Sequence, residues 1–323
     1  MDKKVKSLFS DAILDDFLKR YGLKSAEPVK FAFENLVYFC SKNGKDYVLR
    51  ITHSDRRPRN LVQAEVNWIN YLYENDVPAA VPNKSANNEW VETFNVEGGY
   101  FSAVLFNRAK GNAPTEENHP YKQVGEATAK MHKLALNYKE PPGYQRPDWE
   151  PEHRYVDKYI RKEDIVIAKK WNEIMDYVAK LPKDSKSFGL IHSDVHGGNF
   201  AVDENNNITL FDFDDINYCW FIFDIAMSMY YSVYHILSPE ERNKKIPKYF
   251  NDYMEGYSKH FSLDKKWFSE IPHFLRLRDI LLHILIYRTM GDDYILGRGA
   301  ERIKNRKERI ENDEPFVDFN FRV

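Results

Sequence analysis

The chain is poor in cysteine and almost neutral, and each shortage excludes a class of protein. Its 323 residues include two cysteines, Cys40 and Cys219, which is too few for a disulfide framework. A reducing cytoplasm is therefore the expected location. The formal net charge of −2 argues against binding of nucleic acid over a broad basic surface, so no nucleic-acid partner is expected.

Long apolar runs are also missing. The first residues, Met1–Lys6, are not followed by the apolar stretch of a signal peptide. The runs Phe221–Leu237 and Ile280–Tyr287 are shorter than the roughly 20 apolar residues that span a bilayer, and they contain Asp224 and His283. Both are expected to be buried helices, and no membrane partner is expected. The sequence does not indicate the oligomeric state.

Strand signals dominate the first third of the chain. Asn43-Gly44 is typical of a tight turn between two strands. Apolar spacing indicates the following order: a helix at Ser10–Tyr21, three strands within Val29–Ile51, a helix at Leu61–Tyr73, and strands near Glu89–Phe94 and Tyr100–Phe106.

Helical spacing dominates after Asn107. The expected helices are Tyr121–Leu136, Ile165–Leu181, Asp224–Ile236, Ile246–Tyr257 and Ile271–Met290. The segment Lys139–Pro151, rich in proline and aromatic residues, is expected to be a covering or linking loop. The basic stretch Arg298–Arg309 is expected to be a solvated helix. We predict an α+β fold, with a small antiparallel β-sheet lobe with one internal helix over residues 1–107 and a larger, mainly helical lobe over residues 108–323.

The most informative segment for function is LIHSDVHGGNF, residues 190–200, followed by LFDFDD at 210–215. Asp194 can accept the proton of a substrate hydroxyl or orient that hydroxyl. Asn199 offers a carbonyl oxygen and Asp212 a carboxylate, both suitable ligands for Mg²⁺. Each residue alone is an ordinary turn residue. Together, between apolar strands and with Gly197-Gly198 allowing a tight loop, they indicate a phosphoryl-transfer site. His192 is expected to support the loop; His196 contacts either the loop or a phosphate, or is simply packed or solvated.

A positive charge for the phosphates is available in the first lobe. Arg50 lies on an expected strand and Glu65 in the helix that follows. A strand cation held by a helix carboxylate is an oriented phosphate-binding group. The alternative is an exposed Arg50 and a solvated Glu65, and the motif at 190–215 favours the pair.

These residues resemble the aminoglycoside phosphotransferase and choline kinase-like enzymes, which share the protein-kinase-like fold. His192–Asn199 resembles the family's catalytic loop, and Asp212-Phe213-Asp214 its metal-binding segment. Weaker matches are Phe223–Ala226, whose aspartate braces the catalytic loop in the family, Gly125–His132, which resembles the helix that opens the larger lobe, and Phe33–Tyr38, which resembles the nucleotide-covering hairpin.

The resemblance implies a bilobal fold with ATP bound by the first lobe and Mg²⁺ as cofactor. It implies Asp194 as catalytic base, Asn199 and Asp212 as metal ligands, and Arg50 with Glu65 at the phosphates. It places Asn35 in the hairpin over the nucleotide and makes the segment from Leu105 to Arg108, which includes Phe106 and Asn107, the hinge that meets adenine through its backbone. Two features depart from the pattern: Arg50 stands where many relatives have lysine, and no Gly-x-Gly-x-x-Gly precedes it, so side chains must cover the phosphates.

The expected function is ATP- and Mg²⁺-dependent phosphoryl transfer to a hydroxyl of a small molecule, such as an amino alcohol, an aminoglycoside, a sugar or a homoserine-like compound. One alternative is a Ser/Thr protein kinase, although the short distance in sequence from Asp212 to Asp224 leaves little room for an activation segment. The other is a non-catalytic relative of the same fold.

Acceptor specificity is expected to come from the region after Asp212. Asp214 and Asp215 either attract a cationic amine or cap the next segment and contact Asn217. Arg276, Arg278 and Asp279 are expected on the surface, with the cleft as the alternative. Core packing, rather than an aromatic cage, is expected for the aromatic group Tyr218, Trp220, Phe221, Tyr230, Tyr231 and Tyr234.

Overall fold

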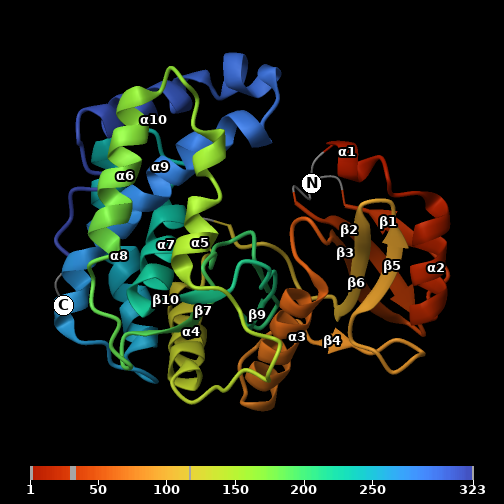
Figure 1. The fold of residues 1–323 in the computed structure, drawn as a ribbon. Helices are drawn as coiled ribbons and strands as arrows, with labels where there is room; N and C mark the ends of the chain where they lie inside the picture. Colours follow the sequence, from red (N-terminus) through yellow and green to blue (C-terminus); the bar gives the residue numbers. More distant parts are fainter. Residues whose placement is uncertain (1–2, 30–33, 116–117, 322–323) are drawn as a thin grey trace.

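An antiparallel sheet from the first 107 residues faces a mainly helical region in the computed structural model, which describes residues 3–29, 34–115 and 118–321 (Figure 1). The strands are β1 (Ala26–Pro28), β2 (Leu36–Lys42), β3 (Lys45–His53), β4 (Pro82–Asn83), β5 (Glu92–Val96) and β6 (Gly99–Asn107). Their spatial order is β1-β2-β3-β6-β4, and β5 also pairs with β6.

The predicted tight turn joins β2 to β3. Asn43 and Gly44 both have positive φ angles, 53° and 71°, which a two-residue hairpin turn of this kind requires. Of the three strands expected within Val29–Ile51, the position of the first is wrong, because β1 ends at Pro28, before that range. Pro28 ends β1 at the sheet edge, where a residue without a backbone N–H is tolerated.

Side chains alternate between two environments along the central strands. On β3, Leu49 and Ile51 are buried in a cluster beneath α2 (Asp11–Tyr21), whereas Arg50 between them lines the cavity on the other face. On β6, Leu105 belongs to the cluster under α2 and Phe106 to the cavity wall. The two-residue period of a strand therefore determines that Arg50 faces the cavity.

Helix α3 (Arg59–Glu74) lies between the sheet and the helical region (Figure 1). Its apolar residues Val62, Val66, Ile69 and Leu72 are buried in the same large core as the helices that follow. The internal helix predicted at Leu61–Tyr73 is therefore present, longer by a few residues at its start, and it contributes to the core of the helical region.

Each of the predicted helices of the second region is present, with bounds that differ by a few residues at most ends. The helical elements after the sheet are α4 (Tyr121–Ala135), α5 (Trp149–Arg154), α6 (Ile165–Val178), α7 (Phe221–Val233), α8 (Pro239–Tyr257), α9 (Ile271–Thr289) and α10 (Ala300–Glu311), with short 3-10 or π turns at Asp157–Tyr159, Lys265–Glu270 and Tyr294–Arg298; a further short helix, α1 (Lys3–Lys6), precedes α2. The expected loop at Lys139–Pro151 ends inside α5 because Asp148 caps that helix.

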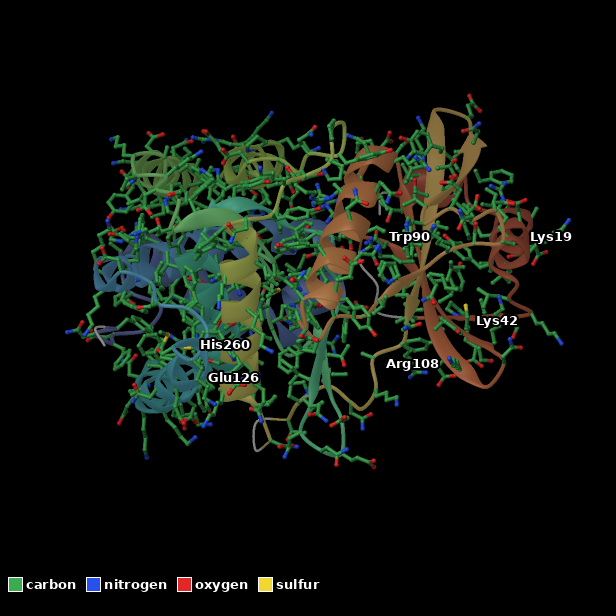
Figure 2. All side chains as sticks on the ribbon, turned by 90° about the horizontal axis from the view of Figure 1, so that it is seen from below. Lys19, Lys42, Trp90, Arg108, Glu126 and His260 are labelled. Atoms are coloured by element: carbon green, nitrogen blue, oxygen red, sulfur yellow. The ribbon has the colours of Figure 1, made fainter. Side chains whose placement is uncertain are left out.

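Helices α4 and α8 approach closely through two glycines. A methyl group on Gly125 would lie 2.1 Å from the Tyr253 carbonyl oxygen, and one on Gly256 would lie 1.9 Å from the Lys122 carbonyl oxygen. In Figure 2, Glu126 on α4 and His260, just beyond α8, lie in the helical region, away from Lys19 and Lys42 on the sheet side. The two segments are joined by a hydrogen bond from Lys259 to Glu126.

Four short strands frame the motif segment. Strands β7 (Phe188–Ile191) and β10 (Asn217–Trp220) pair antiparallel, as do β8 (Phe200–Val202) and β9 (Ile208–Leu210). The prediction of two apolar strands between Asn199 and Asp212 is confirmed, and so is the α+β fold. The lobe boundary at residue 107 stays a prediction. Within the described ranges, none of the helices has both the length and the apolar character needed to cross a membrane.

Candidate active site

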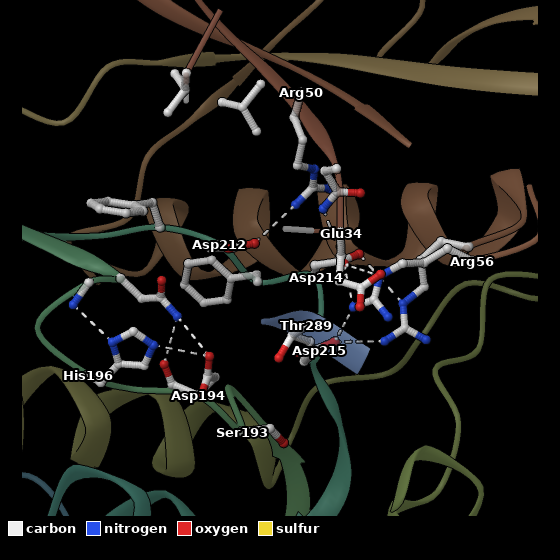
Figure 3. A pocket seen from close by; sticks show the side chains of 18 of the residues that line it. Glu34, Arg50, Arg56, Ser193, Asp194, His196, Asp212, Asp214, Asp215 and Thr289 are labelled. Atoms are coloured by element: carbon white, nitrogen blue, oxygen red, sulfur yellow. Dashed lines mark hydrogen bonds and ion pairs between the residues drawn. The ribbon is translucent and has the colours of Figure 1, made fainter. Parts of the chain in front are cut away.

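A cavity of about 1390 Å³ lies between the sheet and the helical region. Its wall includes Asp194, Asn199 and Asp212 from the motif segment, together with Arg50 from β3. The three motif residues therefore open into one space, as the sequence predicted. Figure 3 shows Arg50 and Asp212 directed toward each other on one side and Asp194 with His196 on the other.

Asp224 on α7 braces the motif loop from behind. Its buried carboxylate accepts hydrogen bonds from the backbone nitrogens of His192 (3.1 Å) and Ser193 (2.7 Å). It also pairs with His132 Nε2 at 3.1 Å, and His132 Nδ1 is 2.7 Å from the Tyr257 hydroxyl. Ser193 has a φ of 70°, so the loop makes a left-handed bend where the carboxylate holds it.

His192 supports the loop, as expected. Its Nε2 is 3.2 Å from the Phe211 carbonyl oxygen, and its ring packs on Phe213 at 4.5 Å. It is buried, and its contacts tie the segment before Asp194 to the segment before Asp212.

Asp194 and Asn199 are held together across the two glycines. Asn199 Nδ2 donates to the Asp194 carbonyl oxygen at 2.9 Å and to Asp194 Oδ2 at 3.1 Å. Because the side-chain nitrogen of Asn199 donates to Asp194, its side-chain oxygen Oδ1 is the atom that is left to bind a metal. His196 Nε2 lies 3.2 Å from Asp194 Oδ2, and Gly198 N donates to His196 Nδ1 at 2.9 Å. His196 therefore belongs to the loop.

Asp212 comes shortly after β9, and its side chain lines the cavity. Its backbone has a φ of 60°, in the left-handed region. The neighbouring Phe211 donates its backbone N–H to the Asn199 carbonyl oxygen at 2.9 Å, which brings Asp212 beside Asn199. Burial, together with the neighbouring Asp214 and Asp215, raises the pKa of Asp212 to about 7, although Arg50 opposes this. About half of this side chain is open to the cavity. A carboxylate with so little nearby compensation suits a bound cation.

Arg50 and Glu65 form the predicted pair. Two parallel hydrogen bonds join them, Nη1 to Oε1 at 2.8 Å and Nη2 to Oε2 at 2.5 Å, and the side chains are 7% and 1% exposed. Arg50 Nη1 is also 3.7 Å from Asp212 Oδ1. The alternative of an exposed arginine and a solvated glutamate is wrong.

Of the other residues expected to bind the nucleotide, some line the cavity and one packs on the far side of the sheet. Asn35 lines the cavity, where it accepts a hydrogen bond from Thr52 Oγ1 at 2.8 Å and lies 3.4 Å from Asp214 Oδ2. Phe106 and Asn107 also line the cavity, whereas the Leu105 side chain packs under α2. Of the expected covering hairpin Phe33–Tyr38, Phe33 lies outside the described residues.

Two arginines of the β3–α3 loop, which the sequence reasoning missed, neutralise Asp214 and Asp215. Arg56 contacts Asp214 Oδ2 (3.0 Å) and Asp215 Oδ1 (2.9 Å), and Arg57 contacts Asp215 Oδ1 at 2.9 Å. Arg57 also makes two hydrogen bonds to Glu152 on α5. These arginines keep the pKa of Asp214 well below its usual range even though burial opposes this. The sequence feature that could have indicated this contact is the Arg56-Arg57 doublet, but its partner Asp215 lies some 158 residues away.

The expected contact of Asp215 with Asn217 is made by the backbone instead. Asn217 Nδ2 donates to the Asp215 carbonyl oxygen at 2.9 Å and to Ser193 Oγ at 2.7 Å. Core packing is confirmed for Trp220, Phe221 and Tyr230. The partly buried side chains Tyr218, Tyr231 and Tyr234 also pack against this core, and Tyr231 and Tyr234 line the cavity as well.

The expectation of a surface position is wrong for Arg278 and Asp279 and correct for Arg276. Arg278 lines the cavity and contacts Asp194, and Asp279 is buried against Arg306 and Arg309 of α10. Arg276 pairs with Asp313 at the surface. The helix expected to be solvated at Arg298–Arg309 is thus solvated on one face only, because Arg306 and Arg309 on its other face pair with the buried Asp279.

Comparison with known proteins yields close matches. The family model described as "Phosphotransferase enzyme family" matches residues 25–259. Amicoumacin kinase of Bacillus subtilis (strain 168) is 31% identical over 99% of this chain and 97% of its own length. The structure of amicoumacin kinase hAmiN in complex with AMP-PNP, Ca²⁺ and Ami has a TM-score of 0.92 at 29% identity and 99% coverage of both chains. A microcompartment-associated aminopropanol kinase shares the fold, with a TM-score of 0.76 at 19% identity over 94% of this chain and 98% of its own.

Proposed function

The chain belongs to the phosphotransferase enzyme family, and we propose that it transfers the γ-phosphoryl group of ATP to a hydroxyl of a small molecule. One observation carries the assignment of roles: Asp194, Asn199 and Asp212 open into one cavity beside Arg50. The sheet side of that cavity is assigned to ATP and the α9 side to the acceptor.

Asp194 is the proposed base. The acceptor hydroxyl donates to its carboxylate, the hydroxyl oxygen forms the new bond to phosphorus, the proton passes to Asp194, and ADP leaves. The hydrogen bonds from Asn199 and His196 fix the carboxylate before the acceptor arrives. Arg50, held by Glu65, contacts the phosphates.

Asn199 and Asp212 are the proposed metal ligands. Among the residues that the structure describes, no group of three or more His, Cys, Asp or Glu side chains is arranged to hold a metal. One carboxylate and one amide oxygen match Mg²⁺, which takes its remaining ligands from phosphates and water. When bound, Mg²⁺ neutralises charge on the phosphates.

Amicoumacin is the first acceptor to test, because the relatives named for it match almost the whole chain. A protein-kinase function is not favoured, since Asp212 is followed directly by β10 and α7 without an intervening segment. A cytoplasmic location is part of the proposal, and the buried, unpaired Cys40 and Cys219 are compatible with it.

The test measures ADP release and product mass with ATP, Mg²⁺ and a panel of amicoumacin, aminoglycosides, amino alcohols and homoserine. Asp194→Asn should lower kcat by about 10²- to 10⁴-fold while ATP affinity is kept. Asp203→Asn is the matched control, because Asp203 lies outside the cavity in the β8–β9 turn and should leave kcat unchanged. Equal kcat in both variants would remove Asp194 from the mechanism, and no product with any acceptor would refute the proposed function.

A further inference from the structure

The guanidinium group of Arg278, on a helix far away in the sequence, contacts the proposed base Asp194. Arg278 of α9 places Nη2 2.5 Å from Asp194 Oδ1, although 84 residues separate the two. Both side chains line the cavity and are largely enclosed, with 15% and 20% of their surfaces exposed. A pair this close and this protected from water is stronger than a surface ion pair.

Two consecutive residues of α7 hold two consecutive residues of α9. The Tyr231 hydroxyl accepts hydrogen bonds from Arg278 Nε at 3.1 Å and Nη2 at 2.5 Å. The Tyr230 hydroxyl donates to Asp279 Oδ1 at 2.8 Å. Arg278 is therefore fixed from behind and is not a mobile arm at the cavity wall.

Helix α10 reinforces this arrangement. Arg309 donates to Asp279 Oδ2 at 2.7 Å, and Arg306 Nε lies 3.3 Å from Asp279 Oδ1. Because Asp279 is bound from two helices, the rotation of α9 that presents Arg278 to the cavity is fixed by contacts outside the cavity. Preorganisation of this kind is what a functional side chain needs.

The position of Arg278 also answers a charge problem of the reaction. The Asp194 carboxylate lies beside the position proposed for an anionic phosphoryl group, where its negative charge needs a nearby cation. Arg50 is engaged by Glu65, and Arg56 is engaged by the carboxylates of Asp214 and Asp215. Of the arginines in the described cavity wall, Arg278 is the one in contact with Asp194.

We propose that Arg278 is a positioning residue for phosphoryl transfer, which orients the Asp194 carboxylate toward the acceptor hydroxyl and offsets its charge beside the transferred group. This role rests on the proposed function. It concerns the acceptor side of the cavity, so it affects turnover rather than ATP binding.

The experiment compares Arg278→Gln, Arg278→Lys and Arg276→Gln. Arg276 is the matched control, since it lies on the same helix and pairs with Asp313 at the surface. Arg278→Gln should lower kcat about 10²-fold, as expected for loss of one positioned charged donor, with the KM for ATP changed by less than about twofold. Arg278→Lys should recover about tenfold of that loss because it restores the charge without the fork. Arg276→Gln should match the wild type.

Three outcomes overturn this role: equal kcat in Arg278→Gln and Arg276→Gln, a lysine variant no better than the glutamine variant, or a loss expressed in the KM for ATP alone. Tyr231→Phe provides a second test if Arg278→Gln does not fold. It removes only the hydroxyl behind Arg278 and should lower kcat several-fold.

A thermal unfolding cycle separates this inference from the proposed function. Asp194→Asn, Arg278→Gln and the double variant should show non-additive shifts in Tm, because the two side chains are in contact. A wild type that phosphorylates no acceptor overturns both the proposed function and the role of Arg278, even where the cycle shows coupling. A wild type that is active, with an Arg278→Gln variant equally active, overturns the role alone.

Discussion

Glu65→Gln tests the nucleotide side of the cavity most directly. Glu65 is 1% exposed and makes two hydrogen bonds to Arg50, which is itself 7% exposed. Breaking a buried ion pair by removing one charge lowers the free energy of unfolding by about 3–5 kcal/mol. Because glutamine keeps an oxygen that can accept from Arg50, we expect a loss of about 3 kcal/mol for Glu65→Gln. For a chain of this size, we expect Tm to fall by about 4 °C.

ATP affinity should fall as well. Without the glutamate, Arg50 still has Asp212 as an ion-pair partner, whose Oδ1 is already 3.7 Å from Nη1. The arginine is then expected to turn toward Asp212 and away from the phosphates. Loss of one charge-assisted contact is worth about 1.5 kcal/mol, which corresponds to about a tenfold rise in the Kd for ATP.

Calorimetric unfolding and ATP titration measure both effects. Glu89→Gln is the control, because the Arg59–Glu89 pair is 37% and 54% exposed and should contribute less than about 1 kcal/mol. Equal unfolding temperatures for Glu65→Gln and Glu89→Gln would contradict the predicted stabilisation by the Arg50–Glu65 pair. ATP binding by Glu65→Gln as tight as that of the wild type would contradict the role of Glu65 in orienting Arg50.

Two further predictions concern stability. Burial lowers the pKa of His283 to about 4, and neither ring nitrogen has a hydrogen-bond partner among the described residues. As the pH falls from about 6.5 to 4, the unfolded chain binds a proton here that the folded chain does not, so the free energy of unfolding falls by up to about 1.4 kcal/mol per pH unit. His283→Leu should reduce this slope in unfolding experiments at pH 7 and pH 5, and an unchanged slope contradicts the assignment. Gly256→Ala should lower the free energy of unfolding by about 1–3 kcal/mol, because its methyl group meets the Lys122 carbonyl oxygen. Gly291→Ala, which has open space around it, should be neutral, and equal stability of the two variants would argue against the close helix contact.

The loop that holds Asp194 and Asn199 was predictable because its geometry is local. Asp194 and Asn199 are five residues apart, and the glycines between them permit the bend that the hydrogen bonds require. The strand pair β8–β9 then carries the chain back, so that Asp212 arrives beside Asn199. Spacing and strand signals alone contain this information.

Arg50 and Glu65 were predictable for a related reason. Because side chains alternate along β3, Arg50 lies on the other face of the sheet from the buried Leu49 and Ile51. Helix α3 follows after a short loop and lies on the face toward which Arg50 points. The start of β1 and the capped helix α5 were missed because short edge strands and one-turn helices leave little periodic signal.

The acceptor side was not predictable in the same way, because its contacts join distant segments. Arg278 of α9 reaches Asp194 across 84 residues. An isolated arginine on a helix is usually a surface residue, and only the packing of α9 between α7 and α10 turns Arg278 inward. The nucleotide side thus depends on short-range geometry that any chain with this loop must share. The acceptor side depends on how helices pack, and it can change while the chemistry stays the same. Substrate identity in this chain is therefore expected to be determined by α7 and α9, and variants of their cavity-facing residues should alter acceptor choice without altering ATP binding.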